Sequence, residues 1–286
     1  MPPAIEPGIE PGCIARDVAR ALEEDLAINL GGGDRSASLV PASQLLETRV
    51  ICREQAVLAG QSWFDETFRQ LDGQVKVDWH IADGGSLRAG AEICHLHGPA
   101  RSILSGERTG LNFLQTLSSV ATCARRYVDA VSGTGVIILD TRKTIPGLRL
   151  AQKYAVRCGG ADNHRFGLFD AILIKENHIA ALGSISKAVE QAKTDYPGLL
   201  LEVEVENLEQ LREAVDAGAQ RALLDNCSIG LLRTAVERYS NRISLEASGG
   251  ISLESVREVA QTGVEFISTG DLTKNIHAID FSMRYL

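Results

Sequence analysis

Short apolar segments alternate with amphipathic segments of helical period throughout the second half of the chain. The apolar segments occupy residues 136–140, 170–175, 199–206, 221–225, 243–248 and 264–270. Helices are expected between most of them, at 184–195, 207–217, 228–239 and 252–262. Repeated strand–helix units form a parallel sheet, because each crossover returns the chain to the same edge. Six such units without a dinucleotide-binding fingerprint favour a barrel over an open sheet.

The first half of the chain has a different pattern. Residues 47–54, 74–81 and 91–98 alternate apolar with polar side chains, which predicts an antiparallel sheet with one face in water. Residues 14–30 and 107–131 carry apolar side chains every three or four positions, which predicts two helices. The fold class predicted for the whole chain is therefore α/β.

Three histidines fall on or near the predicted antiparallel sheet. Strand alternation places His95 and His97 on one face, and His80 ends a neighbouring strand. A metal-binding pair is one interpretation, and polar residues on a solvated strand face are the other. The second is favoured, because the wet face of such a sheet is polar in any case.

Composition restricts the partners of the chain. It has 286 residues, is 44% apolar and 23% charged, and carries a formal net charge of −8. Such a surface repels nucleic acid and anionic membranes, and no apolar run approaches the ~20 residues that span a bilayer. The six cysteines lack a C-x-x-C pair, which predicts reduced thiols in the cytoplasm. We expect neither nucleic-acid nor membrane partners.

Polar residues follow the predicted parallel strands, and they sort by charge. In barrels the catalytic residues lie at the carboxyl ends of the strands. The first two strand ends and the loop between them carry hydroxyl, cationic and imidazole groups: Thr141, Arg142, Lys143, His164, Arg165 and Lys175. The next two carry the carboxylates Glu204 and Asp225. The last two end in small turns: Ser248, Gly249, Gly250, Thr269 and Gly270.

This order of charges has a chemical meaning. Clustered Arg and Lys bind polyanions, and the guanidinium fork suits carboxylates and phosphates. Two carboxylates suit Mg²⁺, which usually arrives with substrate phosphates. Glycine-rich turns before helices bind phosphate through backbone N–H groups. The residues thus predict a barrel enzyme with two anionic subsites, one of them for a phosphorylated, Mg²⁺-bound compound.

Ten segments in order along the chain resemble one family. They are LEEDL, CREQAVLAG, ERTGLNFLQTLSSVAT, DTRKTIPGLRLAQKYAV, NHRFGL, DAILIKENHI, EVEVENLEQL, LLDN, EASGGIS and GVEFISTGDLTKNIHAIDFSMRY. Over roughly residues 14–286 the chain resembles quinolinate phosphoribosyltransferase.

The resemblance implies an architecture and a reaction. The architecture is an N-terminal α/β open-faced sandwich domain (1–118), an incomplete α/β (TIM-like) barrel (119–275), and a tail (276–286) that packs on the first domain. The reaction converts quinolinate and 5-phosphoribosyl 1-pyrophosphate into nicotinate mononucleotide, pyrophosphate and CO₂ in de novo NAD biosynthesis. The resemblance also implies Mg²⁺ and an obligate homodimer, in which Arg108 reaches the partner's active site; association beyond the dimer is left open.

The resemblance assigns roles to the candidate residues. It gives the quinolinate carboxylates to a cationic set: Arg108, Arg142, His164, Arg165 and Lys175. It makes Lys143, Glu204 and Asp225 catalytic, with the two carboxylates serving the metal. Thr141 and Arg53 are further substrate-binding candidates. The turns at Ser248–Gly250 and Thr269–Gly270 would hold the 5-phosphate.

The chain departs from the family pattern at Asp162, Phe169 and Asp271. A carboxylate at position 271, beside a phosphate turn, is unfavourable unless it points away. Other functions share some of these residues: a related phosphoribosyltransferase linked to molybdenum transport genes, a Schiff-base aldolase using Lys143 or Lys175, and a pyridine-dicarboxylate binding protein. The complete cationic set and the carboxylate pair favour quinolinate over all three.

Overall fold

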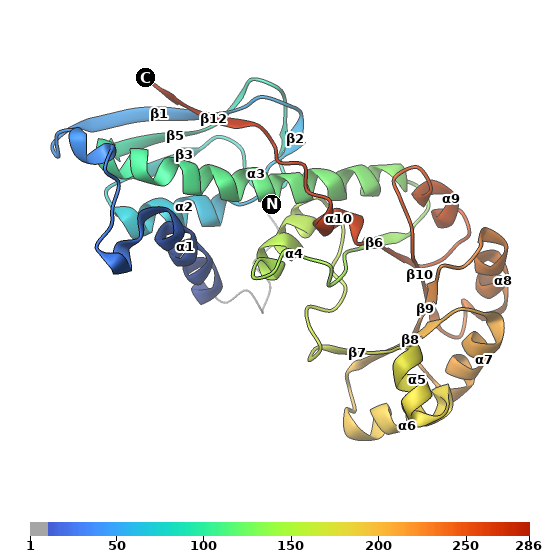
Figure 1. The fold of residues 1–286 in the computed structure, drawn as a ribbon. Coiled ribbons are helices and arrows are strands. Elements are labelled where there is room, and N and C mark those ends of the chain that lie inside the picture. Colours follow the sequence, from blue (N-terminus) through green and yellow to red (C-terminus); the bar gives the residue numbers. More distant parts are fainter. Residues whose placement is uncertain (1–10) are drawn as a thin grey trace. The chain divides into compact units, whose positions relative to one another are not determined.

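The computed structural model describes residues 11–286 and divides into two compact units, each treated separately below (Figure 1). The first unit comprises the chain up to residue 125 with residues 145–160 and 275–286. The second comprises residues 126–144 and 161–274. No helix in the described part of the chain is long and apolar enough to cross a membrane.

The first unit is built on a four-stranded antiparallel sheet in the order β12-β1-β5-β3. Its strands are β1 (Leu45–Cys52), β3 (Lys76–Trp79), β5 (Ala91–Pro99) and β12 (Phe281–Tyr285), with a small separate pair formed by β2 (Ala56–Val57) and β4 (Ser86–Leu87). The three strands predicted from alternation are therefore present. The pairing of β12 with β1 runs from Thr48–Tyr285 to Cys52–Phe281, so the end of the chain forms an edge strand.

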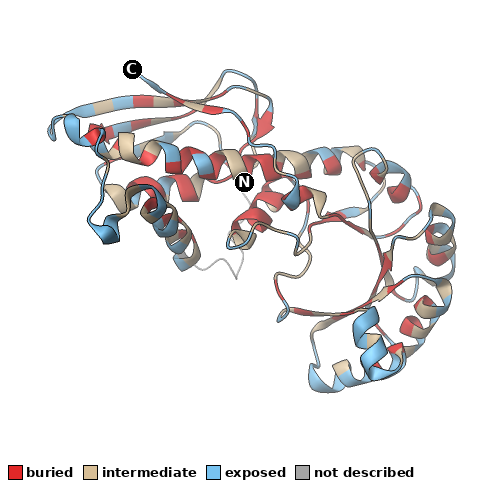
Figure 2. Ribbon diagram, viewed as in Figure 1, coloured by how far each residue is buried: buried red, intermediate tan, exposed pale blue. Residues whose placement is uncertain are grey.

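Helices α2 (Gln61–Leu71) and α3 (Ala100–Ala130) cover one face of this sheet. Helix α1 (Pro11–Leu26) packs against α2, and the unit also contains α4 (Arg149–Cys158) and short 3₁₀ turns at Ile28–Leu30 and Ala37–Leu39. The covered face packs Val50, Cys94 and Leu96 against Phe64 of α2 and Leu114 of α3. Buried and exposed positions alternate along the strands (Figure 2), as expected for a sheet with one wet face.

The second unit contains a six-stranded parallel sheet in the order β6-β11-β10-β9-β8-β7. The strands are β6 (Ile137–Leu139), β7 (Ala171–Ile174), β8 (Leu200–Val205), β9 (Arg221–Asp225), β10 (Ser244–Ser248) and β11 (Phe266–Ser268). The helices are α5 (Glu176–Leu182), α6 (Ile185–Asp195), α7 (Leu208–Ala217), α8 (Ile229–Tyr239), α9 (Val256–Ala260) and α10 (Asp271–Lys274). In the described part of the chain, β6 and β7 are the two edge strands of this sheet and do not pair with each other, so the barrel is incomplete.

The boundaries of the two compact units differ from the predicted domain boundary at residue 118. Helix α3 continues without a break to Ala130, so its packing extends past that point. Residues 145–160 join the first unit, where α4 packs closely against α3: the Arg125 guanidinium donates to the Gly159 carbonyl (2.8 Å). The Tyr154 hydroxyl also donates to the Asp83 carboxylate (2.7 Å).

Close packing at Gly159 predicts a specific stability defect. A Cβ at this position would lie 2.5 Å from both the Ala121 carbonyl oxygen and the Ala124 Cβ. Because neither atom belongs to a flexible side-chain end, we expect Gly159→Ala to lower the free energy of unfolding by about 1–3 kcal/mol. Gly73→Ala, where a Cβ would meet no atom within 4 Å, is the matched control and should change it by less than about 0.5 kcal/mol. Urea unfolding of both variants checks this, and equal midpoints would contradict it.

Candidate active site

Charged side chains share one face of the parallel sheet because of its register. In a strand every second side chain points to the same face, and the pairing places Glu202 beside Arg221 and Asp225 beside Ser248. Glu204 follows Glu202 by two residues and lies on the same face. The predicted site residues of β8, β9 and β10 are thereby brought to one side of the sheet.

The end of β6 is held to the loop that follows α4. The Asp140 carboxylate is fully buried and accepts hydrogen bonds from the Asn163 side-chain amide (2.6 Å) and the His164 backbone N–H (2.9 Å). The backbone of Asp162 also pairs with Leu139 as a parallel bridge. These contacts fix the segment that carries His164 and Arg165 beside the strand end that carries Arg142.

Two arginines of the cationic set lie close to each other. Burial lowers the pKa of the Arg165 guanidinium, and the neighbouring positive charge of Arg142 lowers it further. Arg165 also donates to the Ala171 carbonyl (3.3 Å), which holds it beside β7. Like charges in a half-buried position repel each other, and an anion between them would relieve this cost.

His164 is engaged at both ring nitrogens. Its Nε2 lies 2.9 Å from the Glu202 carboxylate and 3.6 Å from that of Glu246, while its Nδ1 accepts the Arg165 backbone N–H (2.7 Å). An acceptor role for Nδ1 assigns the proton to Nε2. Contact of His164 with a substrate carboxylate would require one of these bonds to be exchanged, and that contact stays a prediction.

Two buried carboxyl groups of this sheet, those of Glu202 and Glu246, were not among the predicted site residues. Burial raises the pKa of Glu202 to about 7 and that of Glu246 to about 8, and for Glu246 the negative charge of Glu202 adds to the effect. Arg221 approaches Glu246 at 3.4 Å and stacks on the Phe266 ring at 3.9 Å. The available signal was each glutamate's position in an apolar strand, two residues before Glu204 and Ser248.

Lys175 forms an ion pair with Glu204 in this structure. The resemblance had assigned the two side chains to different substrates, and the structure brings them together. Burial raises the pKa of Glu204 despite Lys175, and the negative charges of Asp225 and Glu176 add to this effect. Glu204 and Asp225 are therefore close enough to interact, and Asp225 also accepts a hydrogen bond from the Asn226 side chain (2.7 Å).

The turns after β10 and β11 depend on glycine. Gly249 has φ = 94°, and a Cβ there would lie 2.3 Å from the Asn226 side-chain oxygen. A Cβ at Gly270 would lie 2.9 Å from the Lys143 Cδ, so the lysine stem runs over this turn. Two hydrogen bonds fix the backbone of Lys143. Its N–H donates to the Thr141 hydroxyl (3.1 Å), and its carbonyl accepts from the Thr273 hydroxyl (2.8 Å).

The structure gives a local setting for each of the three departures from the family pattern. The Asp271 carboxylate accepts a hydrogen bond from the buried Tyr127 hydroxyl (2.7 Å). The Asp162 side chain caps the Asn163 backbone N–H (2.9 Å). Phe169 is 78% exposed, and its ring lies over Gly167, where a Cβ would come within 2.4 Å of a ring carbon.

The two remaining candidates, Arg53 and Arg108, belong to the first unit. Arg53 forms an ion pair with Asp280 (3.7 Å) and donates to the Ser282 hydroxyl (3.2 Å). Arg108 is exposed on α3. Their parts in catalysis stay predictions.

An incomplete parallel barrel with cations, paired carboxylates and glycine turns at its strand ends defines a class: an α/β-barrel enzyme acting on anionic, phosphorylated substrates. Comparison with known families makes this specific. The model "Quinolinate phosphoribosyl transferase, C-terminal domain" matches residues 120–284, and the N-terminal domain model of that family matches residues 35–118. The chain belongs to the quinolinate phosphoribosyl transferase family.

Curated relatives and solved structures agree with this assignment. A probable nicotinate-nucleotide pyrophosphorylase (carboxylating) of Bacillus subtilis is 44% identical, covering 89% of each chain. The nicotinate-nucleotide pyrophosphorylase (carboxylating) of Mycobacterium leprae is 41% identical, covering 94% of this chain and 96% of the relative. The solved nicotinate-nucleotide pyrophosphorylase of Francisella tularensis has a TM-score of 0.92 at 44% identity and covers 97% of this chain and 98% of that one. The predicted fold class is confirmed by these matches.

The buried carboxyl group of Glu246 predicts a pH-dependent stability. Its raised pKa means that the folded state keeps a proton that the unfolded chain releases near pH 4.5. The resulting stabilisation is complete below that pH and is lost as the pH rises through about 8. Glu246→Gln keeps the position neutral, so its melting temperature should fall less than the parent's between pH 6 and pH 9.

The control for this experiment is Glu258→Gln, at an exposed position on α9. Its pH profile should follow that of the parent chain. Parallel profiles for the parent and Glu246→Gln would show that Glu246 is not the group responsible.

Proposed function

We propose that the chain transfers the phosphoribosyl group of 5-phosphoribosyl 1-pyrophosphate to quinolinate with decarboxylation, giving nicotinate mononucleotide, pyrophosphate and CO₂. Synthesis of this nucleotide for NAD is the role of the family to which the chain belongs. The observation that carries the proposal is the gathering of cations at the ends of β6 and β7, among them the neighbouring pair Arg142 and Arg165, in a chain of this family. Such a pair is suited to a small substrate with two carboxylates.

The quinolinate subsite is proposed at the ends of β6 and β7. Arg142 and Arg165 would each face a carboxylate of the pyridine ring, and Arg108 would complete the set. Lys175 pairs with Glu204, and it would turn from Glu204 to a carboxylate of the substrate when it binds quinolinate.

The phosphoribosyl pyrophosphate subsite is proposed at the turns after β10 and β11. Backbone N–H groups of Gly249, Gly250 and Gly270 would bind the 5-phosphate. Lys143, whose stem lies against Gly270, would neutralise the departing pyrophosphate. Placing Lys143 next to Arg142 in the sequence puts the two subsites side by side, as bond formation between the substrates requires.

Glu204 and Asp225 are proposed to hold Mg²⁺. Two neighbouring carboxylates, one with a raised pKa because of burial and nearby negative charge, form a hard oxygen donor set that a divalent cation would stabilise. Mg²⁺ commonly binds one or two carboxylates and takes its other ligands from water and substrate phosphates, so this donor set fits. When bound, the ion would supply positive charge to the pyrophosphate.

The chain's own residues would then orient the pyridine ring and stabilise the charge that develops on the ribose. As pyrophosphate leaves, positive charge develops on the ribose, and the carboxylate of Glu204 or Asp225 can stabilise it. The pyridine nitrogen carries no proton, so its attack needs no general base. The arginines fix the ring for in-line attack. The alkylated ring is cationic and can accept the electrons released as CO₂ departs.

We also propose a homodimer with shared active sites and a cytoplasmic location. An exposed Arg108 on α3 is available to a second copy of the chain. The six cysteines are free thiols in the structure, which favours a reducing compartment.

A direct assay tests the reaction. Incubation with quinolinate, phosphoribosyl pyrophosphate and Mg²⁺ should yield equal amounts of nicotinate mononucleotide and CO₂. Lys143→Ala should lower kcat by about 100-fold or more, because it removes charge that acts on the leaving group. Product formed from nicotinate but not from quinolinate would overturn the assignment.

Subunit mixing tests the shared site. Arg108→Ala and Lys143→Ala chains should each be inactive, but random exchange makes half the dimers mixed, each with one intact site, which restores about a quarter of the parent activity. The matched control mixes Lys143→Ala with Lys175→Ala. Both of these residues come from the same chain in each site, so no activity should return. Equal recovery in both mixtures, or none in either despite proven exchange, would contradict the arrangement.

A further inference from the structure

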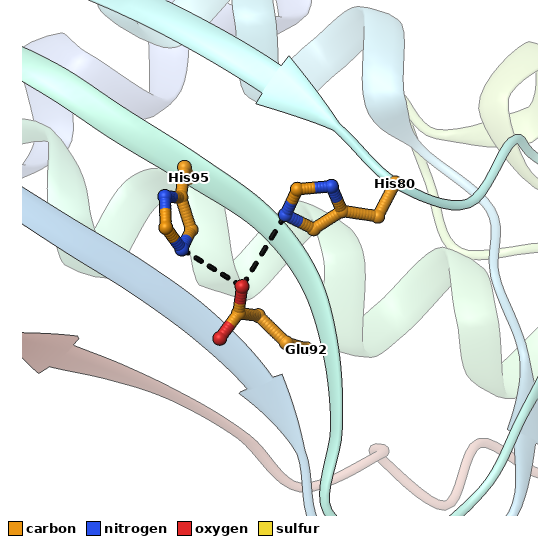
Figure 3. A group of neighbouring side chains, drawn as sticks. All are labelled: His80, Glu92 and His95. Atoms are coloured by element: carbon orange, nitrogen blue, oxygen red, sulfur yellow. Dashed lines mark ion pairs between the residues drawn. The ribbon is translucent and has the colours of Figure 1, made fainter.

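Three potential metal ligands converge on the wet face of the first unit's sheet (Figure 3). The Nε2 of His95 lies 2.8 Å from the Glu92 Oε1, and the Nε2 of His80 lies 3.3 Å from the same oxygen. Their ligand atoms all lie within 4.8 Å of one another. Strand alternation had paired His95 with His97, and the structure instead groups His95 with His80 and Glu92.

A strand irregularity causes this grouping. The pairing of β1 with β5 shifts register between Val50 and Ile51, which pair with Cys94 and Glu92 respectively. Ile93 and Cys94 are consequently both buried. The bulge brings Glu92 and His95, three residues apart, to the same exposed face, where simple alternation would have separated them.

The scaffold holds the third ligand in place. The His80 backbone N–H donates to the Ile93 carbonyl (2.9 Å), which ties the end of β3 to β5. On the opposite face Trp79 packs edge-on against Phe64 at 5.3 Å and donates to Asp65 (2.9 Å). Ligands on paired strands with anchored backbones suit a metal site, because little ordering is needed on binding.

We propose that His80, Glu92 and His95 bind one transition-metal dication of the Zn²⁺ type. Two imidazoles and one carboxylate are a common ligand set for such ions, whereas Mg²⁺ prefers oxygen alone. Ligand atoms around a tetrahedral Zn²⁺ lie about 3.3 Å apart, given metal–ligand distances of about 2.0–2.1 Å. The separation of 3.3 Å between His80 and Glu92 matches that spacing, and the 2.8 Å between His95 and Glu92 would widen by about 0.5 Å on binding.

The surroundings orient the carboxylate and leave room for water. Arg49 donates to the Glu92 Oε2 (3.3 Å), so Oε1 is turned toward the imidazoles. Asp78 pairs with His95 across the strands on the same face, and its negative charge offsets that of Arg49. The side chains of His80 and His95 are 45% and 44% exposed, which leaves a path for the ion and a fourth position for water.

The bound ion would join β3, an edge strand of the sheet, to β5. An ion that binds only the folded state stabilises it in proportion to the logarithm of its concentration over Kd. The site shares no ligand with the residues proposed for catalysis, so the proposal does not rest on the proposed function.

Titration of the full chain with ZnCl₂ alone tests this site. Calorimetry should find one equivalent whose affinity falls at least tenfold in Glu92→Gln, His95→Gln and the double variant His80→Gln/His95→Gln. His97→Gln, with an exposed histidine on the same strand, is the matched control and should bind as the parent does. Near-ultraviolet circular dichroism verifies that each variant is folded.

Cobalt substitution separates this site from the cysteines. Co²⁺ bound by His80, Glu92 and His95 should give visible d–d bands without thiolate charge transfer, and the bands should vanish in the double histidine variant. Thiolate charge transfer, or equal zinc affinity in the parent and the double variant, would overturn the proposal and leave the three residues as an ion-pair cluster only.

Discussion

Parallel strand pairing is the constraint on which the rest of the second unit depends. It brings six carboxyl strand ends to one edge and turns every second side chain to a common face. Charges that are far apart in the sequence are concentrated by this geometry. Arg142 meets Arg165, Lys175 meets Glu204, and His164 meets two buried glutamates. The strand ends thus gather groups of both signs within one small region of the sheet.

The balance within this set differs from one pair to the next. Burial raises the pKa values of Glu202 and Glu246. Near neutral pH these two carboxyl groups are therefore partly or wholly protonated where they contact His164. Glu204 is opposed by Lys175 and remains accessible. Glutamates of the same sheet thus differ in protonation, and the extent of their burial determines the difference.

Sequence reasoning predicted β1, β3 and β5, the six parallel strands, most of the longer helices and the charged strand ends, because hydrophobic period and motif order are local properties. It did not predict helices α2 and α4 or the edge strand β12. It could not predict which charged residues would pair with each other. Lys175 directly follows β7 and Glu204 lies on β8, and only the register that pairs Ile174 with Val203 shows that they meet. Glu246 looked like one polar residue in a short strand, and its role depends on burial by its neighbours. The grouping of His80 with His95 required a bulge that alternation alone does not indicate.

The pairing of β12 with β1 has a consequence for how the chain is made. Strand β1 precedes the whole barrel in the sequence, and its edge partner β12 follows it. A ribosome therefore releases β1 before the barrel and β12 after it, so the outer edge of β1 stays open while the barrel emerges. An unpaired strand edge invites association with other chains. The barrel sequence is therefore an insertion whose speed of synthesis and folding sets how long the nascent first unit stays exposed.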